Sequence, residues 1–267
     1  MVGFYIGNEN DKARKGTKAY IGIDDKARTI TKGYVGDENG KARLCWVSFK
    51  PDPVFENNTW EEIALACRLK VVPDTWSVGD QKTMTIGGWD YTIDIIGMNH
   101  DVYADDSGRA LLTFQMHDLY GDIFGMNSSA TNEGGWTECD MRKIHLPSIM
   151  QLMPKEVQEG IKAVKKTTSS VGTNRYGIIT YDKLFLLSET EITNKSDVSG
   201  YVDGEGTQYR YYRDGASLRK FLDGIRKAWW TRSPHTASSN SFGYVVNDYV
   251  SGTTASVPYG VSFAFCF

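Results

Sequence analysis

Charged residues are nearly missing from the last 35 positions of this 267-residue chain. Between Ser233 and Phe267 there is only Asp248, where the overall charged fraction of 24% would place about eight. The same stretch has no Lys, Arg, Glu, Gln, Met, Trp, Leu or Ile, and is built mainly from Ser, Thr, Gly, Ala, Val, Tyr, Phe and Asn. This local depletion is the feature that an account of function has to explain.

Other absences exclude whole classes of protein. No apolar run approaches the ~18 residues that span a bilayer, and the first residues lack a signal-peptide pattern. We therefore expect a soluble product without membrane insertion. With 30 basic and 33 acidic side chains, the near-neutral balance argues against a nucleic-acid binder. A hydrophobic fraction of 40% allows a packed core, in one large domain or two smaller ones.

Cysteine and histidine are sparse and badly spaced for metal or redox chemistry. The four cysteines contain no C-x-x-C pair, and in a cytosolic product we expect them to be reduced and buried. The four histidines show no H-E-x-x-H spacing. His117 precedes Asp118, but neighbours on a strand point to opposite faces, so we expect no catalytic dyad there. No metal and no cofactor is predicted.

A short repeat fills the first fifty residues. Tyr5-Ile6-Gly7 followed by Lys12-Ala13-Arg14 recurs from Tyr20 and, with Val for Ile, from Tyr34. Each copy predicts a small hairpin, and because a lone hairpin is marginal in water, the copies should stack on each other or on a partner. The segment holds ten Lys/Arg against six Asp/Glu. We interpret residues 1–50 as a β-repeat arm for assembly docking, and the proline-containing residues 51–57 as a linker.

The remaining pattern predicts an α+β fold, because helical patterns come early and strands dominate late. A capping box at Thr59–Glu62 begins a helix with Ile63, Leu65, Ala66 and Leu69 on its apolar side. The other predicted elements are a Lys82–Ile86/Trp89–Ile96 hairpin around Gly87-Gly88 with alternating burial, a strand at Leu111–Met116, helix in two pieces over Cys139–Val164 broken by Pro147 and Pro154, a buried strand at Tyr181–Ser188, a short helix at Leu218–Ile225, and weak strands at Phe242–Val246, Tyr249–Ser251 and Tyr259–Phe267.

Signals for an enzyme are weak. Gly204–Gln208 superficially resembles a phosphate loop, but no strong strand precedes it and no helix follows directly, so a glycine-rich turn is the better interpretation. Glu189 and Glu191 alternate in a strand-like segment, with no second carboxylate pair to place opposite them. We predict that the chain is not an enzyme.

From Thr59 onward the chain resembles a domain family common in bacteria and their phages. The matching motifs are Thr59–Ile63, Trp76–Asp80, Thr113–Gln115, Met126–Ser128, Gly134–Trp136, Asp182–Glu189, Glu205–Tyr209, Trp229–Pro234, Tyr259–Val261 and Phe263–Cys266. The N-terminal repeats look like those that open many phage tail-tip and prophage structural proteins. Together these resemblances imply a phage or prophage tail protein, made in the bacterial cytoplasm, located in the virion and joined to other tail proteins through residues 1–50.

The ending Trp229-Trp230-x-Arg232-Ser233 with Gly260-Val261 and Ala264-Phe265 is similar to a C-type-lectin-like fold. That fold is shared by formylglycine-generating enzymes and by the variable proteins of diversity-generating retroelements. The resemblance implies a C-type-lectin-like ligand-binding domain over residues 58–267, with a variable region at about 233–262. In those systems adenine-directed mutagenesis often rewrites AAC codons. Changing the first two bases of AAC never produces Lys, Glu, Gln, Met or Trp, and all five are absent after Pro234.

This composition suits recognition, because Tyr and Phe give rigid contact area while Ser, Gly and Asn give adaptable hydrogen bonds. The predicted framework residues are Trp229, Trp230, Arg232, Phe242, Gly243, Gly260, Phe263 and Phe265. The predicted ligand-binding residues are His235, Ser238, Ser239, Asn240, Tyr244, Val246, Asp248, Tyr249, Val250, Thr253, Thr254, Ser256 and Val257. Val246-Asn247-Asp248 resembles the calcium motif of sugar-binding lectins without its Trp, and one carboxylate is thin ligation for calcium.

The leading hypothesis is a receptor-recognition protein whose diversified face binds a surface protein or glycan of a host bacterium, serving host adsorption. One alternative is a structural tail or baseplate component without a ligand. Another is an oxidoreductase of the formylglycine-generating type, which would need a close reactive cysteine pair that Cys139 and Cys266 do not obviously supply. A homo-oligomer remains open, although no heptad seam is present.

Overall fold

The computed structural model describes residues 4–7, 13–16, 19–23, 26–30, 32–36, 42–47, 49–171, 176–201, 203–235 and 237–267. The three expected N-terminal hairpins are confirmed, and each forms its own two-stranded antiparallel sheet. Their strands are β1 (Phe4–Gly7), β2 (Ala13–Gly16), β3 (Ala19–Ile23), β4 (Lys26–Ile30), β5 (Lys32–Gly36) and β6 (Ala42–Val47). Among the described residues, no strand of one hairpin pairs with a strand of another. The strand pairing therefore gives no sign that the hairpins stack on each other.

A short 3-10 turn, η1 (Phe55–Asn57), leads into helix α1 (Trp60–Leu69). The predicted capping box is confirmed: Thr59 Oγ1 accepts from Glu62 N at 3.2 Å, and Glu62 Oε2 accepts from Thr59 N at 2.8 Å. The helix ends at Lys70, which adopts a left-handed conformation. Ile63, Ala66 and Leu69 are buried as predicted, and Leu65 is half-buried. This face packs α1 onto the domain core.

The centre of the domain is a five-stranded antiparallel sheet, in the order β12-β18-β9-β8-β7. Its strands are β7 (Gln81–Ile86), β8 (Trp89–Met98), β9 (Leu112–Met116), β12 (Leu184–Phe185) and β18 (Ala264–Cys266). The Gly87-Gly88 hairpin is confirmed, since both glycines have positive φ. The predictions for β7, β8 and β9 are therefore confirmed. The same sheet also includes β12 and β18, which come much later in the sequence.

Aromatic rings fill the space between this sheet and α1. Phe114 of β9 stacks on Phe265 of β18 at 5.1 Å between ring centroids. Trp60 of α1 meets Phe114 edge-on at 5.5 Å. The expected alternation along β8 holds only for its first half, because Asp94 and Ile96 are buried as well. Both faces of the second half of β8 are covered, which excludes a simple half-exposed strand.

The region from Cys139 to Val164 is helical in more pieces than predicted. It contains the π-turn η2 (Met141–His145), α3 (Leu146–Leu152) and α4 (Lys155–Gly160), and the short helix α2 (Gly135–Glu138) precedes it. Pro147 lies in the first turn of α3 and Pro154 is the N-cap of α4, where a missing N–H costs nothing. The two prolines therefore begin helices. Val164 belongs to the next strand, so the predicted end of the helix is wrong.

The single buried strand predicted at Tyr181–Ser188 is also wrong. Strand β10 (Val164–Ser169) pairs with β11 (Gly177–Asp182), and β12 follows after a break at Lys183. Ser188 is the N-cap of helix α5 (Glu189–Thr193) and forms a capping box with Glu191. Glu189 and Glu191 therefore lie in a helix and not in a strand-like segment. The S-x-x-E spacing at Ser188 carries the same signal that located α1.

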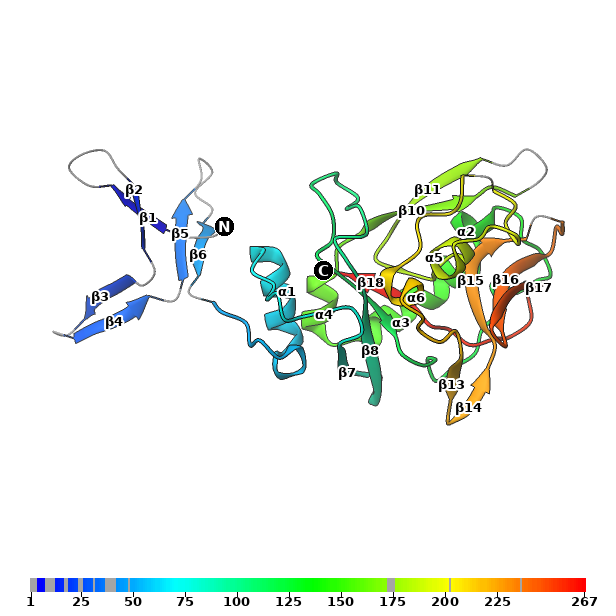
Figure 1. Cartoon of the computed structure of the whole chain (residues 1–267), viewed down its shortest axis with the longest axis horizontal. Helices are drawn as coiled ribbons and strands as arrows, with labels where there is room; N and C mark the ends of the chain where they lie inside the picture. Colours follow the sequence, from blue (N-terminus) through cyan, green and yellow to red (C-terminus); the bar gives the residue numbers. More distant parts are fainter. Residues whose placement is uncertain are drawn as a thin grey trace.

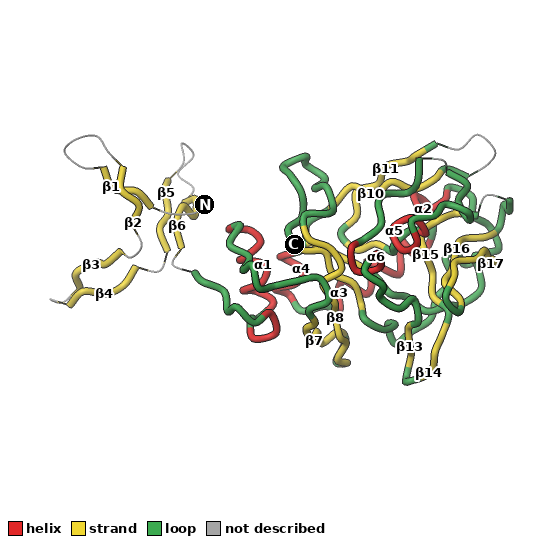
Figure 2. The backbone as a smooth tube through the Cα atoms, viewed as in Figure 1, coloured by secondary structure: helices red, strands yellow, loops and turns green. Residues whose placement is uncertain are grey.

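Loops dominate between α5 and the C-terminal strands (Figure 2). Gly204 and Gly206 have positive φ, in agreement with the predicted glycine-rich turn. A short helix, α6 (Arg210–Arg213), follows. The helix predicted at Leu218–Ile225 is replaced by a hairpin of β13 (Lys220–Leu222) and β14 (Ile225–Lys227). Asp223 and Gly224 both have positive φ, so this Asp-Gly pair is a two-residue hairpin turn.

A three-stranded sheet of β15 (Trp229–Pro234), β16 (Ser241–Val246) and β17 (Tyr249–Thr254) completes the domain. The strand predicted at Tyr249–Ser251 is three residues longer, and that predicted at Tyr259–Phe267 is reduced to β18 and two isolated bridges. In Figure 1 this sheet lies at the end of the domain opposite α1. The fold is α+β, as predicted. No described helix is long and apolar enough to cross a bilayer.

Candidate functional site

The three-stranded sheet presents the predicted variable residues on a buried framework. All eight predicted framework residues are buried, including Trp229, Trp230 and Arg232 on β15. Two of these framework residues are glycines, because neighbouring atoms leave no room for a Cβ at either position. A Cβ on Gly243 would lie 2.6 Å from Thr231 Oγ1, and a Cβ on Gly260 would lie 2.4 Å from Leu119 Cδ1. These residues therefore fix the backbone of the sheet.

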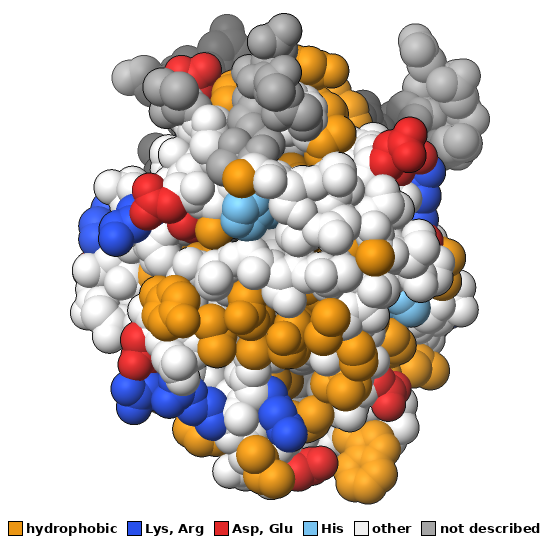
Figure 3. Space-filling view, turned by 90° about the vertical axis from the view of Figure 1, so that its right-hand side faces the viewer, with side chains coloured by type: hydrophobic (Ala, Val, Ile, Leu, Met, Phe, Trp, Pro, Cys, Tyr) orange, Lys and Arg blue, Asp and Glu red, His pale blue; other side chains and the backbone are white. Residues whose placement is uncertain are grey.

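The thirteen predicted ligand-binding residues are all half-buried or exposed. They lie in the segment between β15 and β16 (His235, Ser238, Ser239 and Asn240), on β16 (Tyr244 and Val246), in the following turn (Asp248), on β17 (Tyr249, Val250, Thr253 and Thr254) and just after it (Ser256 and Val257). We call this set the variable face. Figure 3 shows that this end of the molecule carries a band of hydrophobic side chains, with Lys and Arg side chains gathered below it.

Tyr244 belongs partly to the support of this face. Its ring stacks on Tyr259 at 5.0 Å between centroids and at an interplanar angle of 17°. Trp230 meets Tyr259 edge-on at 5.3 Å, and its Nε1 donates to the Phe124 carbonyl at 2.7 Å. Ring stacking and a hydrogen bond inside the cluster hold Tyr244 in one orientation. By contrast, Tyr249 is 55% exposed and stands near the β16–β17 turn.

The β16–β17 turn is held by two arginines from outside the variable region. Arg219 Nε and Nη2 donate to the two oxygens of Asp248, at 2.8 and 2.5 Å. Arg226 of β14 donates to Asn247 Oδ1 at 2.7 Å. The hydrogen bond from Arg219 lowers the pKa of Asp248, so this carboxylate is ionised at neutral pH. Both carboxylate oxygens of Asp248 are thus already paired with Arg219, so Asp248 is less available to bind a ligand than an unpaired carboxylate would be.

The segment before β16 is shaped by hydrogen bonds from Asn132. Asn132 Nδ2 donates to the carbonyls of Ser238, at 2.8 Å, and Ser241, at 3.0 Å. Within the segment Ser238 Oγ donates to Asn240 Oδ1 at 2.5 Å. The carbonyl of Asn240 accepts from Ala255 N at 2.8 Å, which joins this segment to the end of β17. These hydrogen bonds fix the segment before β16 against Asn132 and the end of β17.

A buried ionic cluster lies beneath the sheet. Arg232 of β15 donates to both oxygens of Glu191 on α5, at 2.5 and 3.0 Å. Glu191 Oε1 also lies 2.6 Å from Lys166 Nζ, and Lys166 lies 2.7 Å from Asp101 Oδ1. Although burial alone raises it, the charge of Lys166 holds the pKa of Asp101 at about 2. Two cations and two carboxylates therefore balance each other in the core.

Glu205 is a fifth ionisable member of this cluster. Its oxygens accept from Ser169 N at 2.7 Å and contact Ser233 Oγ. Burial raises the pKa of Glu205 to about 7, although the charge of Arg232 and the hydrogen bonds from Ser233 and Ser169 lower it. Sequence reasoning missed the cluster. The capping box at Ser188 could have placed Glu191 on a helix, but no local signal reveals that Lys166 and Asp101 meet it.

His117 pairs with Asp94, not with its neighbour Asp118. Its Nδ1 lies 2.8 Å from Asp94 Oδ2, and that carboxylate also accepts from Tyr211 OH at 2.8 Å and Gln81 Nε2 at 2.8 Å. The hydrogen bond to Asp94 raises the pKa of His117. The expectation of no His117–Asp118 dyad therefore agrees with the structure. The Asp94 partner lies on the adjacent strand, 23 positions away, where sequence spacing gives no indication of it.

Cys67, Cys139 and Cys266 are buried free thiols, as predicted for the described cysteines. Burial raises the pKa of Cys139 to about 12 and that of Cys266 well above its usual value, so both favour the protonated thiol. The side chain of Cys45 lies outside the described residues. Within the described part of the chain, no three His, Cys, Asp or Glu side chains are grouped to hold a metal ion.

The domain is thus an α+β scaffold that carries a three-stranded sheet with an exposed, charge-poor face. The domain family DUF6273, described only as a domain of unknown function, matches residues 108–267. The match covers more than half of the chain, so the chain belongs to this family. It includes the whole variable face and the framework beneath it. No curated protein and no solved structure matches the chain.

Proposed function

We propose that the chain is a receptor-recognition protein of a phage or prophage tail, in which a C-type-lectin-like domain displays a diversified face to a host bacterium. Residues 1–50 dock it to other tail proteins. The ligand is a surface protein or glycan of the host. The observation that carries this proposal is the division of the C-terminal region, residues 229–265, into eight buried framework residues and thirteen that are half-buried or exposed.

The physical chemistry of the face supports binding. Its side chains are mostly Ser, Thr, Asn, Val and Tyr, which present hydrogen-bonding groups and apolar area with few charges to strip of water. The face rests on a framework that fixes its backbone, so little order has to be gained on binding. Exposed side chains such as Tyr249 can change without disturbing the framework, which is what a diversified surface needs, whereas Tyr244 packs on Tyr259.

Tyr249 gives the sharpest test because it is the most exposed aromatic residue of the face. The full chain, fluorescently labelled, is incubated with intact cells and purified cell walls of strains related to the encoding bacterium. Tyr249→Ala should weaken binding by about tenfold or more, as for an aromatic anchor. Tyr181→Ala is the matched control, since Tyr181 is 58% exposed but lies on β11. Both variants should keep the melting temperature of the unchanged chain.

Equal losses in both variants would contradict a role for the variable face. Failure of the unchanged chain to bind any cells would favour the alternative of a structural tail component. The neighbouring DNA gives an independent test of diversification: a reverse-transcriptase gene and a near-copy of codons 233–267 are expected beside the gene.

A further inference from the structure

A pocket of about 470 Å³ beside the end of α1 is lined by four cations and one carboxylate. The cations are Arg68, Lys70, Arg109 and Lys162, and the carboxylate is Asp105. They come from separate parts of the chain: the last turn of α1, its C-cap, the segment before β9 and the segment after α4. The fold therefore gathers like charges around one cavity.

All four cations are exposed side chains, and none is held in an ion pair by the described part of the protein. Within residues 49–171, 176–201, 203–235 and 237–267, no carboxylate lies within 4.0 Å of any of the four. Arg109 Nη1 donates to the His100 carbonyl, which orients the guanidinium. Four like charges around one hollow raise the local positive potential, and a bound anion relieves their repulsion.

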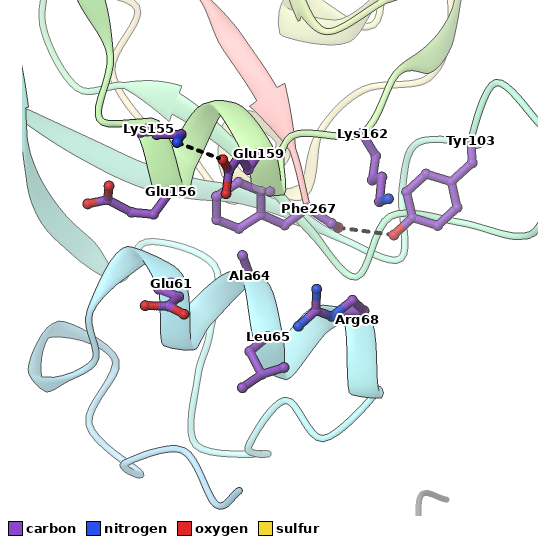
Figure 4. Close-up of a pocket in the computed structure, with 11 residues that line it drawn as sticks. Glu61, Ala64, Leu65, Arg68, Tyr103, Lys155, Glu156, Glu159, Lys162 and Phe267 are labelled. Atoms are coloured by element: carbon purple, nitrogen blue, oxygen red, sulfur yellow. Dashed lines mark hydrogen bonds and ion pairs between the residues drawn. The ribbon is translucent and has the colours of Figure 1, made fainter. Parts of the chain in front are cut away.

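The extent of the positive charge limits the size of the anion. A neighbouring pocket of about 380 Å³, between α1 and α4, shares Arg68, Tyr103 and Lys162 with the first. Figure 4 shows Arg68 and Lys162 pointing toward Phe267 and Tyr103 from opposite sides. Beyond them the wall of the neighbouring pocket holds three carboxylates, Glu61, Glu156 and Glu159, and one lysine, Lys155, which pairs with Glu159 at 3.7 Å. A long polyanion that extended into the neighbouring pocket would be repelled by these carboxylates, whereas a compact anion would not reach them.

We propose that this pocket binds a small phosphate monoester. A phosphate monoester carries about −1.5 to −2 charges at pH 7, which suits the excess of cations better than a single carboxylate does. Arginine guanidinium groups form paired hydrogen bonds with phosphate oxygens. Tyr103 and Leu111 supply apolar wall for the organic part, and the volume lies in the range of small-molecule sites.

The site is separate from the variable face. The pocket lies at the α1 side of the domain, whereas β16 and β17 lie at the opposite end (Figure 1). Its ligand therefore does not compete with a receptor on the variable face, and loss of one activity leaves the other measurable. The pocket inference does not depend on the proposed function.

Calorimetric titration of the full chain with phenyl phosphate tests the inference. Benzoate and phenol are the matched probes, with one negative charge and none. We expect saturable one-to-one binding of phenyl phosphate, at least about tenfold weaker binding of benzoate, and no binding of phenol. The double variant R68Q/K162Q should weaken phenyl phosphate binding by at least about tenfold. K183Q, which changes an exposed lysine outside the pocket, should not alter it.

Three results would overturn the inference. The first is the absence of saturable binding of phenyl phosphate. The second is equal weakening by K183Q and by R68Q/K162Q, which would indicate general surface charge. The third is benzoate binding as tight as that of phenyl phosphate, which would indicate a carboxylate site. Thermal unfolding without the probe establishes that each variant is folded. R68Q can be titrated alone if the double variant does not fold.

Discussion

Glu205 is the residue at which the charge balance beneath the variable face is incomplete. Arg232 and Lys166 are matched by Glu191 and Asp101, and burial raises the pKa of Glu205 from 4.5 to about 7. Above about pH 4.5 the unfolded chain loses this proton, whereas the folded chain keeps it until about pH 7. Stability should therefore fall as pH rises through this window. The full cost, about 3 kcal/mol, is present above pH 7.

Glu205→Gln should remove this pH dependence, because the amide stays neutral at every pH. The amide can still form hydrogen bonds with Ser169 N and Ser233 Oγ. Urea unfolding at pH 5 and pH 8 measures the effect. The variant should gain about 3 kcal/mol over the unchanged chain at pH 8 and much less at pH 5. Glu133→Gln, on the surface, should show no such difference between the two pH values. A constant gap for Glu205→Gln at both pH values would show that Glu205 does not titrate in this window.

At the scale of elements, the sequence predicted those that carry a complete local signal. The capping box at Thr59 located α1, and Gly87-Gly88 located the β7–β8 hairpin. The Asp223-Gly224 turn carries an equal local signal, yet the helix predicted over Leu218–Ile225 is wrong, because β13 and β14 form a hairpin there. The buried cluster could not be predicted, since Arg232 meets Glu191 across 41 positions and no local pattern encodes that distance.

The framework of the variable sheet depends on close backbone approach at Gly243 of β16. A methyl group there would lie 2.6 Å from Thr231 Oγ1 and 3.2 Å from Val198 Cγ1. Gly243→Ala should therefore destabilise the domain by about 1–3 kcal/mol through overpacking. Ser256→Ala, in the exposed segment after β17, should cost less than about 0.5 kcal/mol. Urea unfolding of both variants measures the difference. Equal stabilities would mean that β15 and β16 separate readily at this point.

At the scale of the molecule, the chain combines two kinds of folding unit. The aromatic core, the central sheet and the ionic cluster all lie within residues 49–267. In the N-terminal region each described hairpin pairs only within itself. A two-stranded hairpin is marginal in water, so these repeats need neighbours that bury them. The same near-neutral chain thus combines a domain with an extensive buried core and an arm whose described hairpins pair only within themselves.

This division predicts the effect of removing the arm. A chain that begins at Phe49 should unfold at the same temperature as the full chain, because the packing that stabilises the domain is retained. It should also bind phenyl phosphate and cells unchanged, while losing any association with tail proteins. A peptide of residues 1–50 should show little strand signal by circular dichroism at low concentration. A large drop in the melting temperature of the shortened chain would instead show that the arm packs on the domain and shares its core.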